Sequence, residues 1–116
     1  MAPNSSRFDI PRLIAEGAWQ PFREGIDAIR LHGEIGKAGS AAVLRYRPGA
    51  KLPAHSHTGL EYIFTIQGTQ EDERGAYQEG GLVANFPGTH HSVSSATGCT
   101  VLVIWGGDVA FDTAPV

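Results

Sequence analysis

The stretch GAKLPAHSHTGLEYIFTIQG, residues 49–68, brings two histidines and a glutamate to where one metal ion can bind all three. His55 and His57 are two residues apart in a segment that we expect to be extended, so both side chains leave the same face of a strand. Glu61 follows a short turn, residues 58–60, which can bring its carboxylate back beside the imidazoles. The stretch therefore predicts a metal site built on two consecutive strands.

Length and composition favour one all-β domain. A chain of 116 residues has the usual size of a single domain. Fifteen glycines and seven prolines are spread through short apolar runs, which favours short strands joined by tight turns and hence a β-sandwich or β-barrel. The net charge of −3 and the lack of a basic cluster argue against a nucleic-acid partner.

The N-terminal segment is polar where a secretory signal needs an apolar core, and the longest apolar run, residues 101–105, is too short to span a bilayer. We therefore expect a cytoplasmic protein without a membrane partner. Cys99 is the only cysteine, so neither an internal disulfide nor a CxxC zinc pair can form. We expect Cys99 to be a small buried side chain, and any metal ion to be held by histidine and carboxylate.

Alternation of apolar and polar residues predicts the strands. We expect residues 1–24 to form an N-terminal arm that packs on a single barrel formed by residues 25–116. Gly68 should close the strand that carries Glu61, and the charged segment 71–75 should be a solvated hairpin turn. The glycine-rich segment 33–40 matches no phosphate-binding pattern and is interpreted as a connector. The predicted strands are residues 26–31, 41–47, 52–57, 61–67, 82–86, 100–105 and a short one near 109–111.

The strand after the histidines has a second face that also needs cover. If Glu61 points into the barrel, then Ile63 and Thr65 do too, and three apolar side chains point outward. Sizeable exposed apolar patches usually mark interaction surfaces, so the N-terminal arm or a second subunit should cover this row. We expect a homodimer on this ground. The outward residues are Tyr62, Phe64 and Ile66.

His90 and His91 are both candidates for a fourth ligand. Alternation places His91 in phase with Val93, whereas His90 is in phase with the neighbouring serines. His91 should therefore point inward and His90 should lie at the rim or in solvent. A His-x-His pair also occurs as two surface histidines, and His32, which has no identifiable partner, is interpreted as a surface residue.

Two sequence motifs resemble those of the cupins. Gly49, His55, His57, Glu61 and Gly68 match G(x)5HxH(x)3E(x)6G at every position. The second cupin motif, G(x)5PxG(x)2H, is present in a form shortened by one residue between its proline and its histidine. Its residues are Gly81, Pro87, Gly88 and His91.

The shortened turn, Pro87-Gly88-Thr89-His90-His91, is similar to the PG[ST]xH turn of ChrR-like cupins, and the likeness extends over residues 19–21, 48–50, 61–77 and 98–105. This resemblance implies a single-domain cupin with a double-stranded β-helix, or jelly-roll, barrel. It also implies that one divalent metal ion is bound by His55, His57, Glu61 and His91. Such a ligand set suits zinc, iron, manganese or nickel.

The resemblance implies two kinds of function. The family includes the C-terminal half of a zinc-binding anti-sigma factor, and it is similar to non-haem iron dioxygenases that cleave small β-diketones. This sequence lacks the Cys/His zinc motif of the anti-sigma partner domain, which argues against direct sigma-factor binding. The hypotheses are a metal-dependent oxygenase, a non-catalytic zinc-binding sensor or regulatory module, and a barrel in which the metal is purely structural.

The predicted inner wall is mostly apolar, which suits a small carbonyl or aromatic ligand as substrate of the oxygenase. No side-chain base is identified beyond the metal ligands. Tyr46 and Cys99 are interpreted as core residues. The wall is expected to comprise Leu44, Tyr46, Ile63, Thr65 and Val93, with Phe86 or Trp105.

Overall fold

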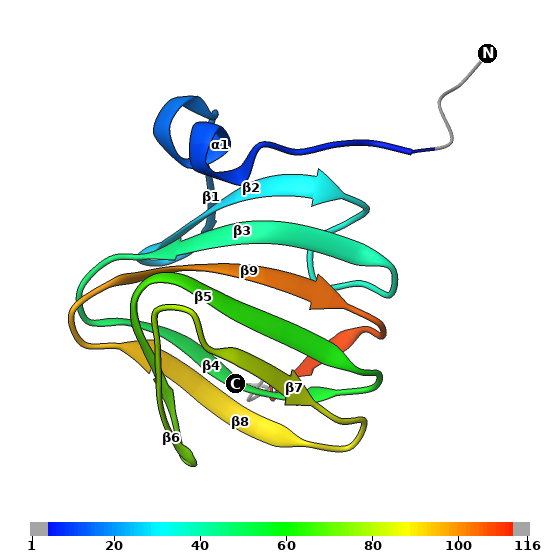
Figure 1. Cartoon of the computed structure of the whole chain (residues 1–116). Helices are drawn as coiled ribbons and strands as arrows, with labels where there is room; N and C mark the ends of the chain where they lie inside the picture. Colours follow the sequence, from blue (N-terminus) through cyan, green and yellow to red (C-terminus); the bar gives the residue numbers. More distant parts are fainter. Residues whose placement is uncertain (1–4, 113–116) are drawn as a thin grey trace.

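The computed structural model describes residues 5–112, which form one short helix and ten strands (Figure 1). The outer ends of the expected arm and barrel, residues 1–4 and 113–116, lie outside the described part. In chain order the elements are α1 (Ile10–Glu16), β1 (Gln20–Arg23), β2 (Ile26–His32), β3 (Ser40–Tyr46), β4 (Ala50–His57), β5 (Glu61–Asp72), β6 (Gly75–Gln78), β7 (Leu82–Asn85), β8 (His90–Ser95), β9 (Cys99–Trp105) and β10 (Val109–Phe111).

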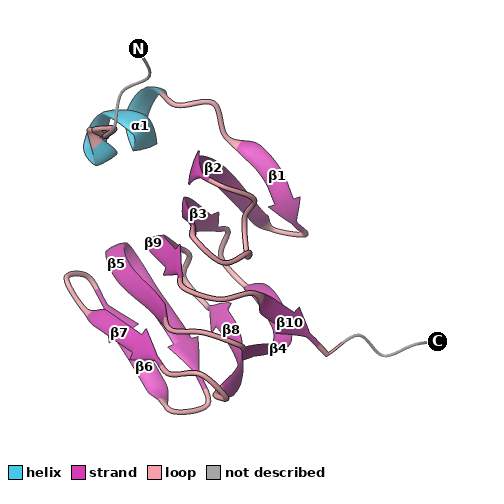
Figure 2. Ribbon diagram, turned by 90° about the vertical axis from the view of Figure 1, so that its right-hand side faces the viewer, coloured by secondary structure: helices cyan, strands magenta, loops and turns pink. Residues whose placement is uncertain are grey.

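The strands form one curled antiparallel sheet in the order β1-β2-β3-β9-β5-β8-β4-β10, with β6 and β7 also paired to β5. The long strand β5 joins the two layers that this curling produces (Figure 2). Its first half pairs with β9 and β7, and its second half pairs with β6 and β8. The expectation of an all-β barrel is confirmed, and every predicted strand is present with ends shifted by a few residues.

The prediction that Gly68 closes its strand is wrong. β5 runs through Gly68 to Asp72, because a register shift between Thr65 and Gln67 turns the strand from one layer into the other. Gly68 has a φ of +75°, a conformation that favours glycine. The segment 71–75 is therefore only partly a turn: its first two residues belong to β5, and Gly75 begins β6.

The inward-facing side chains form a single core between the two layers. Alternate residues of β3, β5 and β9 contribute to it, as expected for strands with one face toward the interior. Full burial of each large aliphatic side chain contributes about 1.5–3 kcal/mol to folding. Cys99 is buried here, as predicted. The core comprises Ile26, Ala28, Ala42, Leu44, Tyr46, Leu52, Ile63, Val93, Cys99, Val101, Val103 and Trp105.

The N-terminal segment starts with α1 and then joins the sheet. The Asp9 side chain caps the helix by accepting a hydrogen bond from the backbone N–H of Arg12 (3.1 Å). The helix ends at Gly17, where a Cβ would lie 2.6 Å from Cδ1 of Ile29 on β2. Residues 20–23, which the sequence assigned to the arm, form β1 and pair with β2. Within residues 5–112, no helix is long and apolar enough to cross a membrane.

Candidate metal centre

Three buried histidines converge inside the barrel. β4 carries His55 and His57, and β8 carries His91 as the paired neighbour of His55. One ring nitrogen from each histidine lies within 4.8 Å of one from each of the others, and all three residues are at most 2 % exposed. The prediction that His91 points inward is confirmed. His90 is exposed and contacts Asp112, with 2.6 Å between Nε2 and Oδ2.

The hydrogen bonds of Thr89 fix the tautomer of His57. The Thr89 hydroxyl lies 2.7 Å from the backbone carbonyl of Phe86, to which it donates its single proton. The same oxygen lies 2.8 Å from Nδ1 of His57, so it must accept a hydrogen bond from an Nδ1–H group. A neutral imidazole has one proton, and Nε2 of His57 is therefore left with a lone pair.

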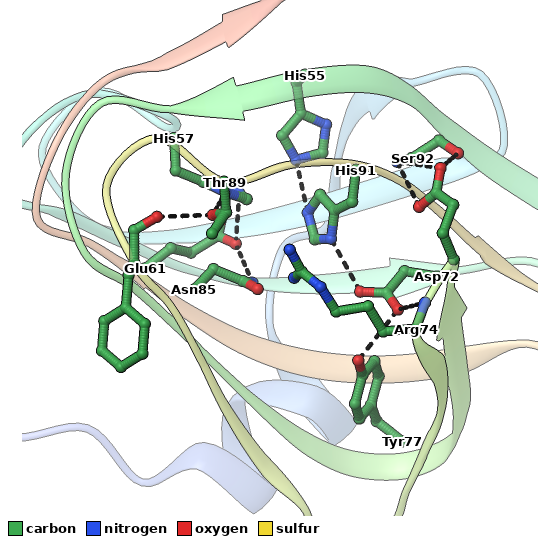
Figure 3. Close-up of polar contacts among 12 residues, drawn as sticks. His55, His57, Glu61, Asp72, Arg74, Tyr77, Asn85, Thr89, His91 and Ser92 are labelled. Atoms are coloured by element: carbon green, nitrogen blue, oxygen red, sulfur yellow. Dashed lines mark hydrogen bonds and ion pairs between the residues drawn. The ribbon is translucent and has the colours of Figure 1, made fainter.

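The other two histidines are oriented in the same way, and Figure 3 shows the contact of His91 with Asp72. Nδ1 of His55 lies 2.8 Å from the carbonyl oxygen of Pro53, and Nδ1 of His91 lies 3.0 Å from Oδ2 of Asp72. Both partners are acceptors, so both Nδ1 atoms carry the proton. The two Nε2 atoms are only 3.0 Å apart. In the neutral rings their lone pairs face each other, an arrangement that a cation between them would stabilise.

Glu61, the first residue of β5, places a carboxylate beside His57, while the group of mutually close ligand atoms consists of the three histidines. Its Oε1 accepts a hydrogen bond from Nδ2 of Asn85 (3.0 Å) and lies 2.9 Å from Nε2 of His57. Burial alone would raise the pKa of the Glu61 carboxyl. The neighbouring His57 and Asn85 side chains lower this pKa by a larger amount, so the net shift is downward. Glu61 is therefore ionised at neutral pH, with Oε1 2.9 Å from Nε2 of His57.

These contacts fit a divalent metal ion. Nε2 of His57 is buried and, among residues 5–112, makes no hydrogen bond of acceptable geometry although Oε1 of Glu61 is 2.9 Å away, which is the state expected of a metal-ligating nitrogen. Burial lowers the pKa of His55 by more than the hydrogen bond to the Pro53 carbonyl raises it, so His55 is neutral at pH 7. Three imidazole nitrogens with a carboxylate beside one of them can hold zinc or iron.

The residues that orient the histidines were only partly predictable. Thr89 lies in the PG[ST]xH turn, so the motif itself held the signal. Asp72 was interpreted as part of a solvated turn, and this is wrong: its side chain is 3 % exposed and accepts hydrogen bonds from Tyr77 Oη (3.0 Å) as well as from His91. Burial alone would raise the pKa of Asp72, but hydrogen bonds from His91, from the backbone N–H of Arg74 and from Tyr77 lower it by more, so the net shift is downward.

An apolar cavity of about 200 Å³ adjoins the histidine cluster. Trp105 contributes to its wall, but Phe86, the alternative to it, is 65 % exposed and lies outside the cavity. Thr65 is buried without lining it. The segment 33–40 was interpreted as a connector, yet three of its residues line the cavity. The wall includes Ile35, Gly36, Lys37, Leu44, Tyr46, Leu52, Ile63, Gln70, Val93, Val103 and Trp105.

Comparison with solved structures places the fold among the cupins. A putative acetylacetone dioxygenase from Methylibium petroleiphilum has a TM-score of 0.81 at 16% identity, covering 100% of this chain and 88% of that chain. The acetylacetone dioxygenase of Acinetobacter johnsonii has a TM-score of 0.77 at 17% identity, covering 96% and 78%. At these identities the likeness establishes the fold alone.

A third similar structure is the complex of Rhodobacter sphaeroides SigE with the anti-sigma ChrR. The TM-score is 0.71 at 21% identity, covering 87% of this chain and 53% of that chain. This chain thus spans about half the length of that match. Comparison with functionally curated proteins gave no match. Residues 12–107 match the family model of the ChrR cupin-like domain, which is most of the chain. The protein therefore has the cupin-type jelly-roll fold, and it belongs to the ChrR cupin-like domain family.

Proposed function

We propose that this cupin binds one divalent metal ion through His55, His57, Glu61 and His91 and acts as a non-haem oxygenase on a small carbonyl compound. The observation that carries the proposal is the position of the cluster. Ring nitrogens of three buried histidines converge, with a carboxylate beside them, next to an apolar cavity that accommodates a small molecule and that His55, His91 and Glu61 line. A purely structural metal would need no such cavity beside it.

When bound, the metal ion would supply Lewis acidity and, if it is iron, redox chemistry with dioxygen. The chain's own residues provide the binding site. The apolar wall excludes water, and burial, followed by the charges of Cys99 and Glu61, raises the pKa of Tyr46 so that its phenol keeps its proton. Nε1 of Trp105 is buried without a partner among the described residues. The Trp105 indole N–H is therefore available to donate a hydrogen bond to a carbonyl oxygen in the cavity, whereas the Tyr46 hydroxyl is already hydrogen-bonded to Gln70.

The comparisons support this choice of reaction class without deciding it. Two similar structures are those of a putative and a named acetylacetone dioxygenase, and they align with almost the whole chain. Function depends on the site more than on the fold, so the likeness raises the priority of β-diketones and related carbonyl compounds as test substrates.

The test is dioxygen uptake by the iron-loaded protein with a panel of β-diketones, hydroxyketones and oxo acids. We expect uptake with at least one member of the panel and its loss in His57→Ala. His32→Ala is the matched control, because His32 is exposed on β2 and should leave uptake unchanged. If the iron-loaded wild type consumes no oxygen with any member, the oxygenase proposal is wrong.

The family match favours a second candidate, a non-catalytic zinc-binding regulatory module. The chain belongs to the ChrR cupin-like family, and one similar structure is that of the anti-sigma ChrR with SigE. The metal present in protein purified from its own host separates the two candidates. Iron favours the oxygenase, and zinc, together with no turnover on the panel, favours the regulatory module.

We also propose that the protein is a homodimer. Two rows of apolar side chains cross β3, β9, β5 and β7 on the outer face of the sheet, and neither row contains a charged residue. Four large members are strongly exposed: Tyr62 (39 %), Phe64 (38 %), Ile104 (46 %) and Leu82 (63 %). The helix α1 ends over Ile29 on β2 and does not cover them. The rows are Ala41, Ile104, Tyr62 and Ala84, and Val43, Leu102, Phe64 and Leu82.

A further inference from the structure

Arg23 is a charged group at the cavity that the proposed function does not use. It is the last residue of β1 and lines the cavity. Its guanidinium carbon lies 4.2 Å from the ring centre of Phe111 and 5.4 Å from that of Phe22, both of which also line the cavity. No carboxylate of residues 5–112 forms an ion pair with it. Arg23 is therefore held by two aromatic rings while its charge remains available.

The position of Arg23 marks the mouth of the cavity. β1 and β10 are the two ends of the strand order, and no pairing joins them (Figure 2). Arg23 on β1 and Phe111 on β10 meet across this unpaired seam. The ring of Phe111 lies in turn 5.3 Å from the ring of His55, between their centres. Only one aromatic ring thus separates the guanidinium group from the proposed metal ligands.

The charges around the cavity favour an anion at this mouth. Lys37 is the second cation of the wall, but it is near Asp108 (3.9 Å), which also accepts a hydrogen bond from the backbone N–H of Ala38. Among the described residues that line the cavity, Glu61 is the only carboxylate, and it lies at the histidine cluster. Nothing on the wall neutralises Arg23, so a ligand carboxylate can pair with it in a charge-assisted, bidentate hydrogen bond.

The size of the cavity limits the ligand further. A volume of about 200 Å³ is below the usual range for drug-sized ligands, about 300–1,000 Å³. At about 30 Å³ for each water molecule, it corresponds to about seven waters. A compound with a carbonyl, a carboxylate and a few carbon atoms fits this volume, and a sugar nucleotide does not.

We propose that the cavity is specific for a small oxo acid, whose carboxylate pairs with Arg23 at the mouth and whose carbonyl group lies at the histidine cluster. This proposal rests on the proposed function for the cluster end of the cavity. It goes beyond that function by assigning the charge of the substrate and the residue that selects it. Arg23 is then a specificity-determining residue, and a neutral diketone of the same shape should be a poorer ligand.

Two probes of nearly the same shape test this assignment. Acetoacetate carries a carboxylate oxygen where acetylacetone carries a methyl group. Binding of both is measured by calorimetry without oxygen, on protein loaded with Co²⁺, and the metal content of the protein is checked after each titration. We expect acetoacetate to bind about tenfold more tightly than acetylacetone, a difference of about 1.4 kcal/mol, because only acetoacetate can form a charge-assisted hydrogen bond with Arg23.

The variants locate the preference. Arg23→Gln should abolish the preference for acetoacetate by lowering the affinity for acetoacetate alone. Arg23→Lys should keep part of the preference, and the affinity for acetylacetone should be unchanged in both variants. Arg47→Gln is the control, because Arg47 is exposed near Asp27 and does not line the cavity. Equal affinity of the wild type for both probes, binding of neither at millimolar concentration, or an equal loss for both in Arg23→Gln would overturn the assignment.

Failure of this proposal and failure of the oxygenase proposal give different results. The titrations need no oxygen and no turnover, so a preference for acetoacetate that depends on Arg23 supports the assignment even if oxygen uptake is absent. Conversely, oxygen uptake with a neutral diketone and no preference for the anion would support the oxygenase and overturn the role of Arg23.

Discussion

Each of the three buried histidines is oriented by a different kind of acceptor. His55 faces a backbone carbonyl, His57 faces a hydroxyl, and His91 faces a carboxylate. The carbonyl cannot be removed by a side-chain substitution, whereas the hydroxyl of Thr89 and the carboxylate of Asp72 can. Residues that orient a metal-ligating histidine typically contribute about 10–100-fold to metal affinity, so these two positions test the centre without touching a ligand.

Thr89→Val should weaken metal binding by about 10–100-fold, because Nδ1 of His57 loses its acceptor and the ring loses its fixed tautomer. Thr89→Ser keeps the hydroxyl and should bind metal like the wild type. Thr97→Val, at an exposed position, controls for the change of residue type. Zinc affinity is measured by competition with a chromophoric chelator. If Thr89→Val and Thr89→Ser bind zinc equally well, the hydroxyl does not orient His57.

The metal-free protein should lose stability as the pH falls from neutral. The pKa of His55 is lowered from 6.5 by burial, so below this pH the unfolded state binds the proton first, and stability is lost as the pH falls toward the folded pKa. Glu61 and Asp72 also have lowered pKa values, from 4.5 and 3.8, and their contributions are lost at lower pH still. Every shift acts in the same direction.

Urea midpoints with a chelator present, at pH 7.5, 6.0 and 5.0, measure this dependence. The midpoint should fall at each step. His55→Asn should reduce the change in urea midpoint between pH 7.5 and 6.0. His32→Asn, at an exposed position, should leave this change as it is in the wild type. A midpoint that stays constant or rises on acidification would contradict the assignment of a neutral, buried His55.

At the scale of the element, β5 connects the metal centre to the residues that orient it. Glu61 begins the strand at the cluster, and Asp72 ends it behind His91. The strand reaches both points because it crosses from one layer to the other near Gly68. A Cβ at Gly68 would collide with the carbonyl oxygen of Gly98 and lie 2.9 Å from Cα of Cys99.

Gly68→Ala should therefore lower the free energy of unfolding by about 2–5 kcal/mol, the sum of a left-handed backbone conformation and a steric clash. Gly80→Ala is a matched control: its φ is +87°, but a Cβ there meets nothing within 4 Å. It should cost only the backbone contribution, about 1–2 kcal/mol. Chemical denaturation measures both. Equal losses in the two variants would show that the contact with residues 98 and 99 is unimportant.

The crossing in β5 also marks the limit of what the sequence could predict. Alternation identified the inward residues up to Thr65, because inward positions on a regular strand are two apart. The register shift after Thr65 changes that phase, so Gln70 and Asp72 point inward although alternation from Glu61 places them outward. The shift depends on pairing with a distant strand, and a single sequence carries no direct sign of it.

At the scale of the whole molecule, the cavity mouth is formed by residues from opposite ends of the chain. Arg23 lies in the segment that the sequence assigned to an N-terminal arm, and Phe111 lies in β10. Spacing along the chain predicts that His55, His57 and Glu61 lie close together. The alternation of inward and outward residues adds His91 to this group. Neither indicates that β1 and β10 close on each other, because that contact follows from the curling of the entire sheet.

The outer apolar face gives a prediction about assembly. If two copies cover each other's exposed rows, the wild type at micromolar concentration should sediment at twice the 12.3 kDa chain mass. Phe64→Glu places a charge in the middle of this face and should shift the protein to monomer, because a buried unpaired charge is costly. The exposed position of Phe64 should leave the fold intact, which circular dichroism checks.

Phe8→Glu is the matched control, since Phe8 is similarly exposed (46 %) but lies before α1, away from the two rows. It should remain dimeric. The metal content of the Phe64→Glu monomer separates assembly from the metal centre: the outward side chain does not line the cavity, so metal binding should persist. A wild-type mass equal to that of the monomer would contradict the proposed dimer. A Phe64→Glu variant that remains dimeric would show that the interface lies on another face.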